Sequence, residues 1–275
     1  MNPIAYITSD LTKVYNDFGL FSRIKDRLKI RLDSQAYIKE FDLKILNMYV
    51  PPNLNESAYM NNIRRAAKYL RNSNVLIAPK ISRILDYRFF NDFEMNLFGY
   101  SVIQSTRLIL RSCQKSIRES CIILYDAAEP ITEPVIQYLA KEARYVILVS
   151  EDTNKLKLIQ EYTAANYGIS VVTTTDIENS IKFADFIITT RDIDRYVNIP
   201  VWYLNNLSKP FKKTGLEVND ISFKVPWDFY NNEMSLELLG ALLSQTGEKD
   251  VEKALRRYEI YIHNFTFGGG LYKAM

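Results

Sequence analysis

The chain has few of the residues that build disulfide frameworks and metal centres. Its 275 residues include two cysteines, Cys113 and Cys121, and a single histidine, His263. Two cysteines do not make the disulfide framework of a small secreted domain, and the sequence contains no CxxC or Cys/His cluster with zinc spacing. One histidine argues against a His-based metal site and against a Ser-His-Asp triad. We therefore predict no metal site and a cytoplasmic protein.

Long apolar runs and an excess of one charge are also missing. No apolar run approaches the ~18 residues that a membrane span needs, and the opening MNPIAYITSD does not have the pattern of a signal peptide. The 35 basic and 32 acidic residues nearly balance, at a net charge of +3. Positive charge is densest in FSRIKDRLKIRL, residues 21–32, where a solvated helix or strand face explains it better than a phosphate track. We expect neither a membrane nor a nucleic acid as partner.

What the chain does have, from Ser120 to Asn206, is a regular alternation of strand and helix patterns with short connections. The expected strands are 121–126, 144–152, 169–176, 185–192 and 199–206, and the expected helices are 129–143, 153–168 and 177–184. The strands are continuous apolar and β-branched runs, which is typical of strands buried on both faces of a parallel sheet. Right-handed crossovers then predict an α/β, Rossmann-like doubly wound sheet.

The rest of the chain predicts a second α/β lobe and a helix that joins the two. The expected elements of the first lobe are strands at 4–10, 42–50 and 74–80 and a helix at 55–72. Apolar residues at helical spacing over 93–116, despite Gly99, predict the long linking helix. Two further helices are expected near 233–245 and 248–264. The predicted parts are an N-terminal α/β lobe (1–92), a linking helix (93–118), a Rossmann-like domain (119–232), and C-terminal helices and tail (233–275).

Two segments of the predicted sheet resemble a known family. The turn after the first strand reads Asp126-Ala127-Ala128-Glu129-Pro130-Ile131, and residues 184–190 read ADFIITT. They resemble the GAGxxG turn and the ADIVISAT strand of the shikimate dehydrogenase and glutamyl-tRNA reductase group of Rossmann proteins. The resemblance implies an NAD(P) cofactor, with the following residues beside it: Asp126, Glu129, Thr189, Thr190 and, on the adenosine ribose, Glu151. For Glu151 and the adjacent Asp152, a strand-end turn and helix cap is the alternative.

All three glycine positions of that turn carry other residues, namely Asp126, Ala128 and Ile131. The glycines allow a tight turn and a close approach of the pyrophosphate to the helix N-terminus. Side chains obstruct this approach, and Asp126 and Glu129 add negative charge facing the phosphates. The cofactor therefore stays unassigned, because the resemblance implies NAD(P) while the missing glycines disfavour it.

The first lobe contains a shorter resemblance. Residues 74–80, NVLIAPK, resemble the NVTIPxK motif of shikimate dehydrogenases, whose lysine is catalytic, and Asn91-Asp92 lies about where that family has its partner aspartate. The resemblance implies that Lys80 donates a proton to a carbonyl oxygen and that Asp92 orients the substrate. The sequence departs from the family in the short interval between the two residues and in the missing TDG core. A strand-terminal lysine facing water is the alternative.

Two functions of different classes remain open. The first is a Rossmann-fold dehydrogenase-like protein with an inter-lobe cleft, which as an enzyme would be an NAD(P)-dependent oxidoreductase. The second is a non-catalytic small-molecule-binding, regulatory or partner-supporting protein; a methyltransferase is a weaker third. A small-molecule ligand stays open, and any such ligand is expected at Lys80, Asp92 and the Thr189–Thr190 strand end. A homo-oligomer or a partner protein also stays open.

Overall fold

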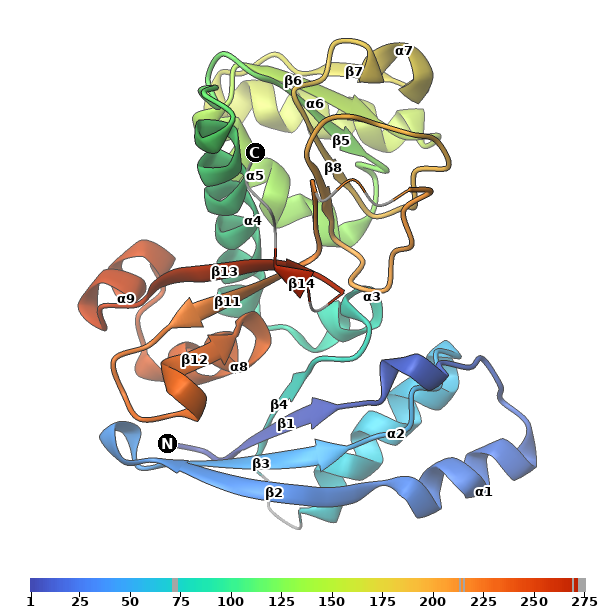
Figure 1. Ribbon diagram of the computed structural model, residues 1–275, viewed down its shortest axis with the longest axis vertical. Coiled ribbons are helices and arrows are strands. Elements are labelled where there is room, and N and C mark those ends of the chain that lie inside the picture. Colours follow the sequence, from blue (N-terminus) through green and yellow to red (C-terminus); the bar gives the residue numbers. More distant parts are fainter. Residues whose placement is uncertain (71–73, 213, 215, 269, 272–275) are drawn as a thin grey trace. The chain divides into compact units, whose positions relative to one another are not determined.

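The computed structural model describes residues 1–70, 74–212, 214, 216–268, 270 and 271. The chain forms two compact units, each built from two stretches of sequence (Figure 1). Unit 1 comprises Met1–Glu94 and Ser222–Tyr261, and unit 2 comprises Met95–Ile221 and Ile262–Met275. Helix α4, Asp92–Ser112, begins in unit 1 and continues in unit 2.

Unit 2 contains a six-stranded sheet in which all neighbouring strands run parallel. Its strands are β5 (Cys121–Tyr125), β6 (Tyr145–Val149), β7 (Val172–Thr174), β8 (Phe186–Thr189), β9 (Val201–Tyr203) and β10 (Glu217–Val218). The order across the sheet is β10-β9-β8-β5-β6-β7. Counted along the chain this is the Rossmann order 3-2-1-4-5-6, whose topological switch point lies between the first and fourth strands, β5 and β8. The prediction of a Rossmann-like parallel sheet is confirmed.

Helices cover both faces of this sheet, as in a doubly wound fold. On one face Ile123, Ile187 and Val201 form a core with the short helix α7, Ile177–Ile181. On the other face Trp202 reaches α4, where its indole Nε1 donates to Ser105 Oγ at 2.9 Å. The remaining helices of unit 2 are α5 (Glu133–Glu142), which contacts both α4 and α6, and α6 (Thr153–Tyr167).

Gly99 explains how α4 and α5 approach each other so closely. A Cβ atom at this position would lie 2.5 Å from the carbonyl oxygen of Pro134. Real side chains do not tolerate that distance from a backbone atom. The glycine that weakens the helical pattern in the sequence is therefore required by packing.

Unit 1 contains a four-stranded sheet of order β2-β3-β1-β4. The strands are β1 (Ile4–Thr8), β2 (Arg31–Ile38), β3 (Leu43–Tyr49) and β4 (Leu76–Pro79). Strand β1 runs parallel to β3 and β4, whereas β2 is antiparallel to β3. Its helices are α1 (Leu20–Lys29), α2 (Glu56–Tyr69), α3 (Arg83–Asp86), α8 (Leu236–Leu243) and α9 (Val251–Arg257). Helix α8 packs on β1 and β4, so its sequence-distant leucines complete the core of the first lobe.

The prediction of a helix from 248 to 264 is wrong in its second half. Helix α9 ends at Arg257, Glu259 has a positive φ of 54°, and β13, Tyr261–Phe267, follows. Aromatic and β-branched residues recur in this segment, which favours a strand, and β13 pairs antiparallel with β14, Gly270–Leu271. His263 therefore lies in a strand. Two further strands, β11 (Asp220–Lys224) and β12 (Glu233–Ser235), form an antiparallel pair that the sequence did not predict.

Short 3-10 helices connect several of these elements. They are η1 (Leu11–Lys13), η2 (Lys39–Phe41), η3 (Tyr87–Phe89), η4 (Pro130–Thr132), η5 (Tyr230–Asn232) and η6 (Ser244–Thr246). Within the part of the chain that the structure describes, no helix combines the length and the apolar character needed to cross a bilayer.

Candidate functional site

The turn after β5 holds a residue other than glycine in a left-handed backbone conformation. Asp126 has a φ of +63°, in the left-handed region that glycine favours and other residues seldom adopt. The turn is held by the Ala127 N–H, which donates to the Val149 carbonyl at 3.0 Å, and by the Glu129 N–H, which donates to the Asp126 carbonyl at 3.1 Å. Asp126 thus places a carboxylate directly after β5.

The Asp126 carboxylate joins the ends of β5 and β8. It is only 6% exposed, and its Oδ2 accepts from Thr190 Oγ1 at 2.9 Å and from Arg191 Nε at 2.8 Å. The hydrogen bond that Arg191 donates to Asp126 raises the pKa of Arg191, whose side chain is 51% exposed. We call these three residues the Asp126 cluster. The cluster occupies the switch point, where doubly wound sheets bind their ligands.

The N-terminal turn that leads into α5 has few backbone donors to offer an anion. Pro130 and Pro134 have no N–H group. The N–H groups of Thr132 and Glu133 donate to carbonyls within the turn, those of Glu129 and Pro130. A helix N-terminus binds phosphate through unpaired N–H groups, so the engagement of these donors weakens that capacity.

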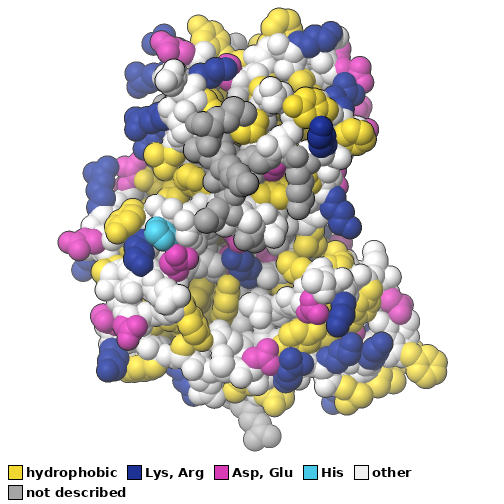
Figure 2. Space-filling model, in the orientation of Figure 1, with side chains coloured by type: hydrophobic (Ala, Val, Ile, Leu, Met, Phe, Trp, Pro, Cys, Tyr) yellow, Lys and Arg dark blue, Asp and Glu magenta, His cyan; other side chains and the backbone are white. Residues whose placement is uncertain are grey.

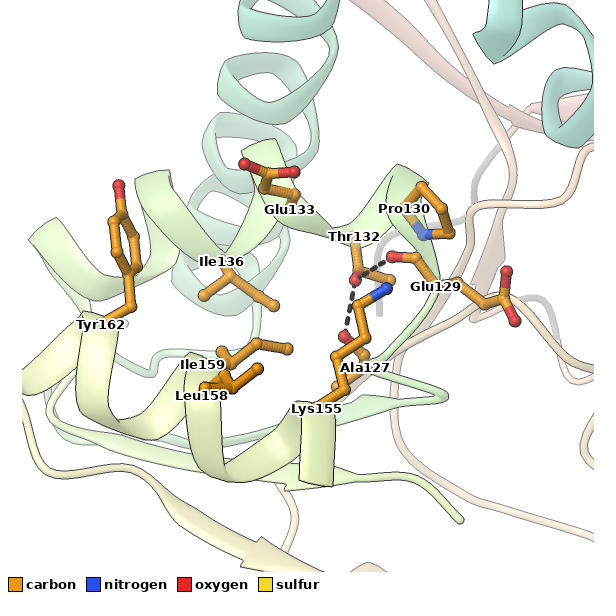
Figure 3. A pocket seen from close by; sticks show the side chains of 10 residues that line it. All are labelled: Ala127, Glu129, Pro130, Thr132, Glu133, Ile136, Lys155, Leu158, Ile159 and Tyr162. Atoms are coloured by element: carbon orange, nitrogen blue, oxygen red, sulfur yellow. Dashed lines mark hydrogen bonds between the residues drawn. The ribbon is translucent and has the colours of Figure 1, made fainter. Parts of the chain in front are cut away.

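A pocket of about 270 Å³ opens beside this turn, between α5 and α6 (Figure 3). Its lining is formed by Ala127, Glu129, Pro130, Thr132, Glu133, Ile136, Lys155, Leu158, Ile159 and Tyr162. Most of the exposed wall is apolar, and Lys155 extends from α6 toward the turn at Thr132. Apolar walls with a few polar groups at one end are typical of small-molecule sites.

The structure brings some of the predicted cofactor residues together. Asp126 and Thr190 are in direct contact, and Glu129 lines the neighbouring pocket. Thr189 is fully buried, and its Oγ1 accepts from the Arg191 N–H at 3.0 Å. Their role in binding a cofactor stays a prediction.

Glu151 lies outside both the Asp126 cluster and the pocket lining. It is exposed in the turn after β6. Its neighbour Asp152 is the N-cap of α6, and its Oδ1 accepts from the Lys155 N–H at 3.0 Å. The helix-cap interpretation is therefore confirmed for Asp152.

The two predicted catalytic residues belong to unit 1. Lys80 directly follows β4, and its N–H donates to the Ile7 carbonyl at 2.8 Å, which extends the pairing with β1. Its side chain is partly buried. Asp92 is exposed at the first position of α4. An acid–base role for this pair stays a prediction.

Sequence reasoning missed a buried group of charged residues in unit 1. Asp86 is 1% exposed and accepts from the Tyr59 hydroxyl and from the Ile81 N–H, the latter at 2.9 Å. Arg83 Nη2 lies 3.4 Å from Glu237 Oε1, and both side chains are 3% exposed. Burial raises the pKa of Asp86 to about 7. No local signal reveals the group, because Glu237 is 154 residues from Arg83 along the chain.

Glu94 is another buried carboxyl of this unit. It forms a reciprocal cap with Asn91 at the start of α4: Glu94 Oε2 accepts from the Asn91 N–H at 2.7 Å, and Asn91 Oδ1 accepts from the Glu94 N–H at 3.0 Å. Burial raises the pKa of Glu94 to about 7. Among the described residues, no group of three or more His, Cys, Asp or Glu side chains has an arrangement that could hold a metal ion.

No family model matches the chain, and no curated protein matches it either. The solved structures it resembles include the ligand-free form of 5-ketofructose reductase of Gluconobacter sp. strain CHM43, at 8% identity and a TM-score of 0.38, over 94% of this chain and 98% of that one. Another is L-tryptophan dehydrogenase from Nostoc punctiforme, at 10% identity and a TM-score of 0.30 over 68% of this chain. The match spans 56% of that dehydrogenase. The assignment of a Rossmann-type α/β sheet rests on the strand order and the parallel pairing of the chain itself.

Proposed function

We propose that the chain is a dehydrogenase-like Rossmann protein that binds a small molecule in the α5–α6 pocket and does not use NAD(P) at the β5 turn. The residues of the turn support descent from the shikimate dehydrogenase and glutamyl-tRNA reductase group. The observation that carries the proposal is the buried carboxylate of Asp126 at the first glycine position, bonded to Thr190 and Arg191.

The Asp126 cluster works against a pyrophosphate in two ways. Its carboxylate repels phosphate at the point of closest approach, and it neutralises Arg191, the nearby cation that would otherwise attract phosphate. The turn contributes a third obstacle, because Pro130 and Pro134 remove two N–H groups from the start of the helix. The Asp126 cluster does not line the neighbouring pocket, whose wall is mostly apolar.

We expect the chain to bind NAD, NADH, NADP and NADPH with dissociation constants no tighter than about 1 mM, or about −4 kcal/mol. Isothermal titration calorimetry measures this directly. The Asp126→Gly variant keeps a residue suited to positive φ and releases Arg191, so we expect it to bind these dinucleotides more tightly than the unmodified chain. A micromolar dissociation constant for the unmodified chain would contradict the proposal.

The pocket is tested with benzyl alcohol, a small ring with one polar end. At ten times its dissociation constant, a ligand of the native state adds about 1.4 kcal/mol of stability, so the melting temperature should rise and saturate. Ile159→Trp fills the pocket and should abolish the rise. Lys157→Trp places the same side chain on the exposed surface of α6 and should preserve it. Equal responses of the two variants would count against binding in this pocket.

An oxidoreductase that holds its cofactor in an altered turn is the second candidate. The half-exposed Arg191 favours it, because a guanidinium group matches phosphate geometry. In that case Lys80 would be the proton donor and Asp92 would orient the substrate. The dinucleotide titration separates the two candidates, since only the second requires micromolar binding by the unmodified chain.

A further inference from the structure

Helix α1 has its polar side turned inward and its apolar side turned outward. Of its ten residues only Ser22 and Asp26 are buried. Four large apolar residues are exposed instead: Leu20 at 68%, Phe21 at 86%, Ile24 at 52% and Leu28 at 80%. An amphipathic helix of a globular protein normally faces its core with the apolar side, so this arrangement leaves an apolar face without a partner among the described residues.

The inward side is fixed by a dense set of hydrogen bonds to Asp26. This residue is fully buried, and Tyr15 donates its hydroxyl to Oδ1. Asn53 Nδ2 and Asn62 Nδ2 donate to Oδ2 at 2.9 and 3.0 Å. A buried carboxylate with several donors holds its helix in one rotation, because any turn about the axis would leave these groups unpaired. The outward position of the apolar face is therefore determined by the fold.

Basic side chains border the apolar face on both sides. At about 100° per residue, Leu20, Ile24, Leu28 and Phe21 cover an arc of roughly 100°. Arg23 and Arg27 follow on one side of this arc and Lys25 and Lys29 on the other. All four are exposed, whereas the single acidic residue of the helix, Asp26, is buried.

The apolar surface extends beyond the helix at its N-terminal end. Phe18 is 44% exposed, and the guanidinium group of Arg23 lies 5.1 Å from its ring centroid. Hydrophobic and basic side chains lie next to each other over this region of unit 1, at the lower right of Figure 2. We call Phe18 and the exposed side chains of α1 the α1 face.

We infer that the α1 face binds the surface of an anionic lipid bilayer, with α1 lying in the plane of the interface. An apolar arc that enters the acyl boundary and long basic side chains that reach headgroups on either side are the features of interfacial helices. Cations near an anionic leaflet strengthen such binding. The inference does not depend on the proposed small-molecule function.

Two other occupants fit the charges less well. A second copy of the chain would bring four more cations against the four already present, so the two faces would repel each other. A groove on another protein would have to enclose the apolar arc and also neutralise cations on both of its borders. A planar anionic surface attracts the basic side chains on both borders of the apolar arc at once. We therefore replace the prediction of no membrane partner with this inference.

The test is co-sedimentation of the full chain with vesicles of phosphatidylcholine that contain about one-third phosphatidylglycerol. We expect binding that is at least tenfold weaker to vesicles of phosphatidylcholine alone, and weaker at high salt because exposed charges are screened. The double variant Phe21→Ser, Leu28→Ser should lower the partition coefficient at least tenfold. Phe183→Ser removes a phenylalanine that is 71% exposed elsewhere on the surface and should leave binding unchanged.

Several results would overturn the inference. One is a failure of the unmodified chain to bind anionic vesicles. Another is a double variant that binds these vesicles as well as the unmodified chain does. Dimers in vesicle-free solution that the double variant converts to monomers would show instead that the face joins two copies. Unchanged unfolding midpoints for both variants establish that any loss of binding comes from the surface and not from misfolding.

Discussion

Gly99→Ala should lower the stability of unit 2 by about 2 kcal/mol, although alanine is the better helix former. Helix propensity alone favours the substitution by about 1 kcal/mol. The added Cβ would lie 2.5 Å from the Pro134 carbonyl oxygen and 2.6 Å from its carbonyl carbon, both backbone atoms. Because neither can rotate away, α4 and α5 must separate, and we expect this overpacking to cost about 3 kcal/mol, at the upper end of the usual range. The steric term therefore outweighs the propensity term.

The two tryptophans make this measurement specific to one unit. Trp202 belongs to unit 2 and Trp227 to unit 1, and both are buried. In a Trp227→Phe background, the fluorescence of Trp202 during urea unfolding reports unit 2. Gly168→Ala serves as the comparison: Gly168 has a φ of +67° and open space around its Cβ position, so we expect only the strain of about 1 kcal/mol. A neutral or stabilising Gly99→Ala would show that the two helices do not meet as described.

The parallel sheet of unit 2 could be predicted because its strands carry their own signal. Most residues of continuous apolar runs such as CIILY and YVILV are buried or half-buried, and short connections limit the order in which such strands can pair. The turn at Asp126 could be located for the same reason. Its contacts with Arg191 could not be, because they join residues 65 positions apart that only the sheet brings together.

The elements that were missed lack a strong local pattern. Strand β2, Arg31–Ile38, is mostly exposed and contains charged residues, so nothing in its sequence resembles a buried strand. Its place comes from antiparallel pairing with β3. Strand β13 follows α9 after a short turn, and no proline or glycine in the sequence marks the boundary between them.

The orientation of α1 shows the same limit at the level of a single residue. The sequence showed a basic and apolar helix or strand face and gave no indication of which side is buried. Asp26 decides this, and its partners Tyr15, Asn53 and Asn62 come from other parts of the chain. In the folded chain these hydrogen bonds, and not the four apolar residues, coincide with the buried side of α1.

Unit 1 should become less stable as the pH rises from 5 to 8. Burial raises the pKa of Asp86 from its ordinary 3.8 to about 7, so between these values the folded chain binds a proton that the unfolded chain has released. The contribution of Asp86 to the stability of unit 1 is therefore fully present below about pH 4, and it is lost as the pH rises through 7. At about 1.4 kcal/mol per pKa unit, Asp86 contributes up to about 4 kcal/mol to this loss.

The loss of stability with rising pH is shared between Asp86 and a second buried carboxyl, and charged neighbours shift the pKa of both. Glu237 on α8 raises the pKa of Asp86 further, and Arg83 on α3 opposes it. Glu94 on α4 has a pKa near 7 for the same reason of burial, with a contribution from Glu237, and so loses its proton over the same range. We therefore expect the effects of the two carboxyl groups to add, and a substitution at one of them to remove only part of the pH dependence.

Asp86→Asn isolates the larger contribution. The amide cannot ionise, while its oxygen can still accept from the Ile81 N–H, so the slope of stability against pH should fall by about half or more. In a Trp202→Phe background, the fluorescence of Trp227 reports the unfolding of unit 1. Urea unfolding at pH 5, 6, 7 and 8 then gives the free energy of unfolding at each pH, and so the slope. Asp92→Asn removes an exposed carboxyl at the start of α4 and should leave the slope unchanged. If Asp86→Asn retained the full slope, the buried group that releases its proton near pH 7 would be a different one.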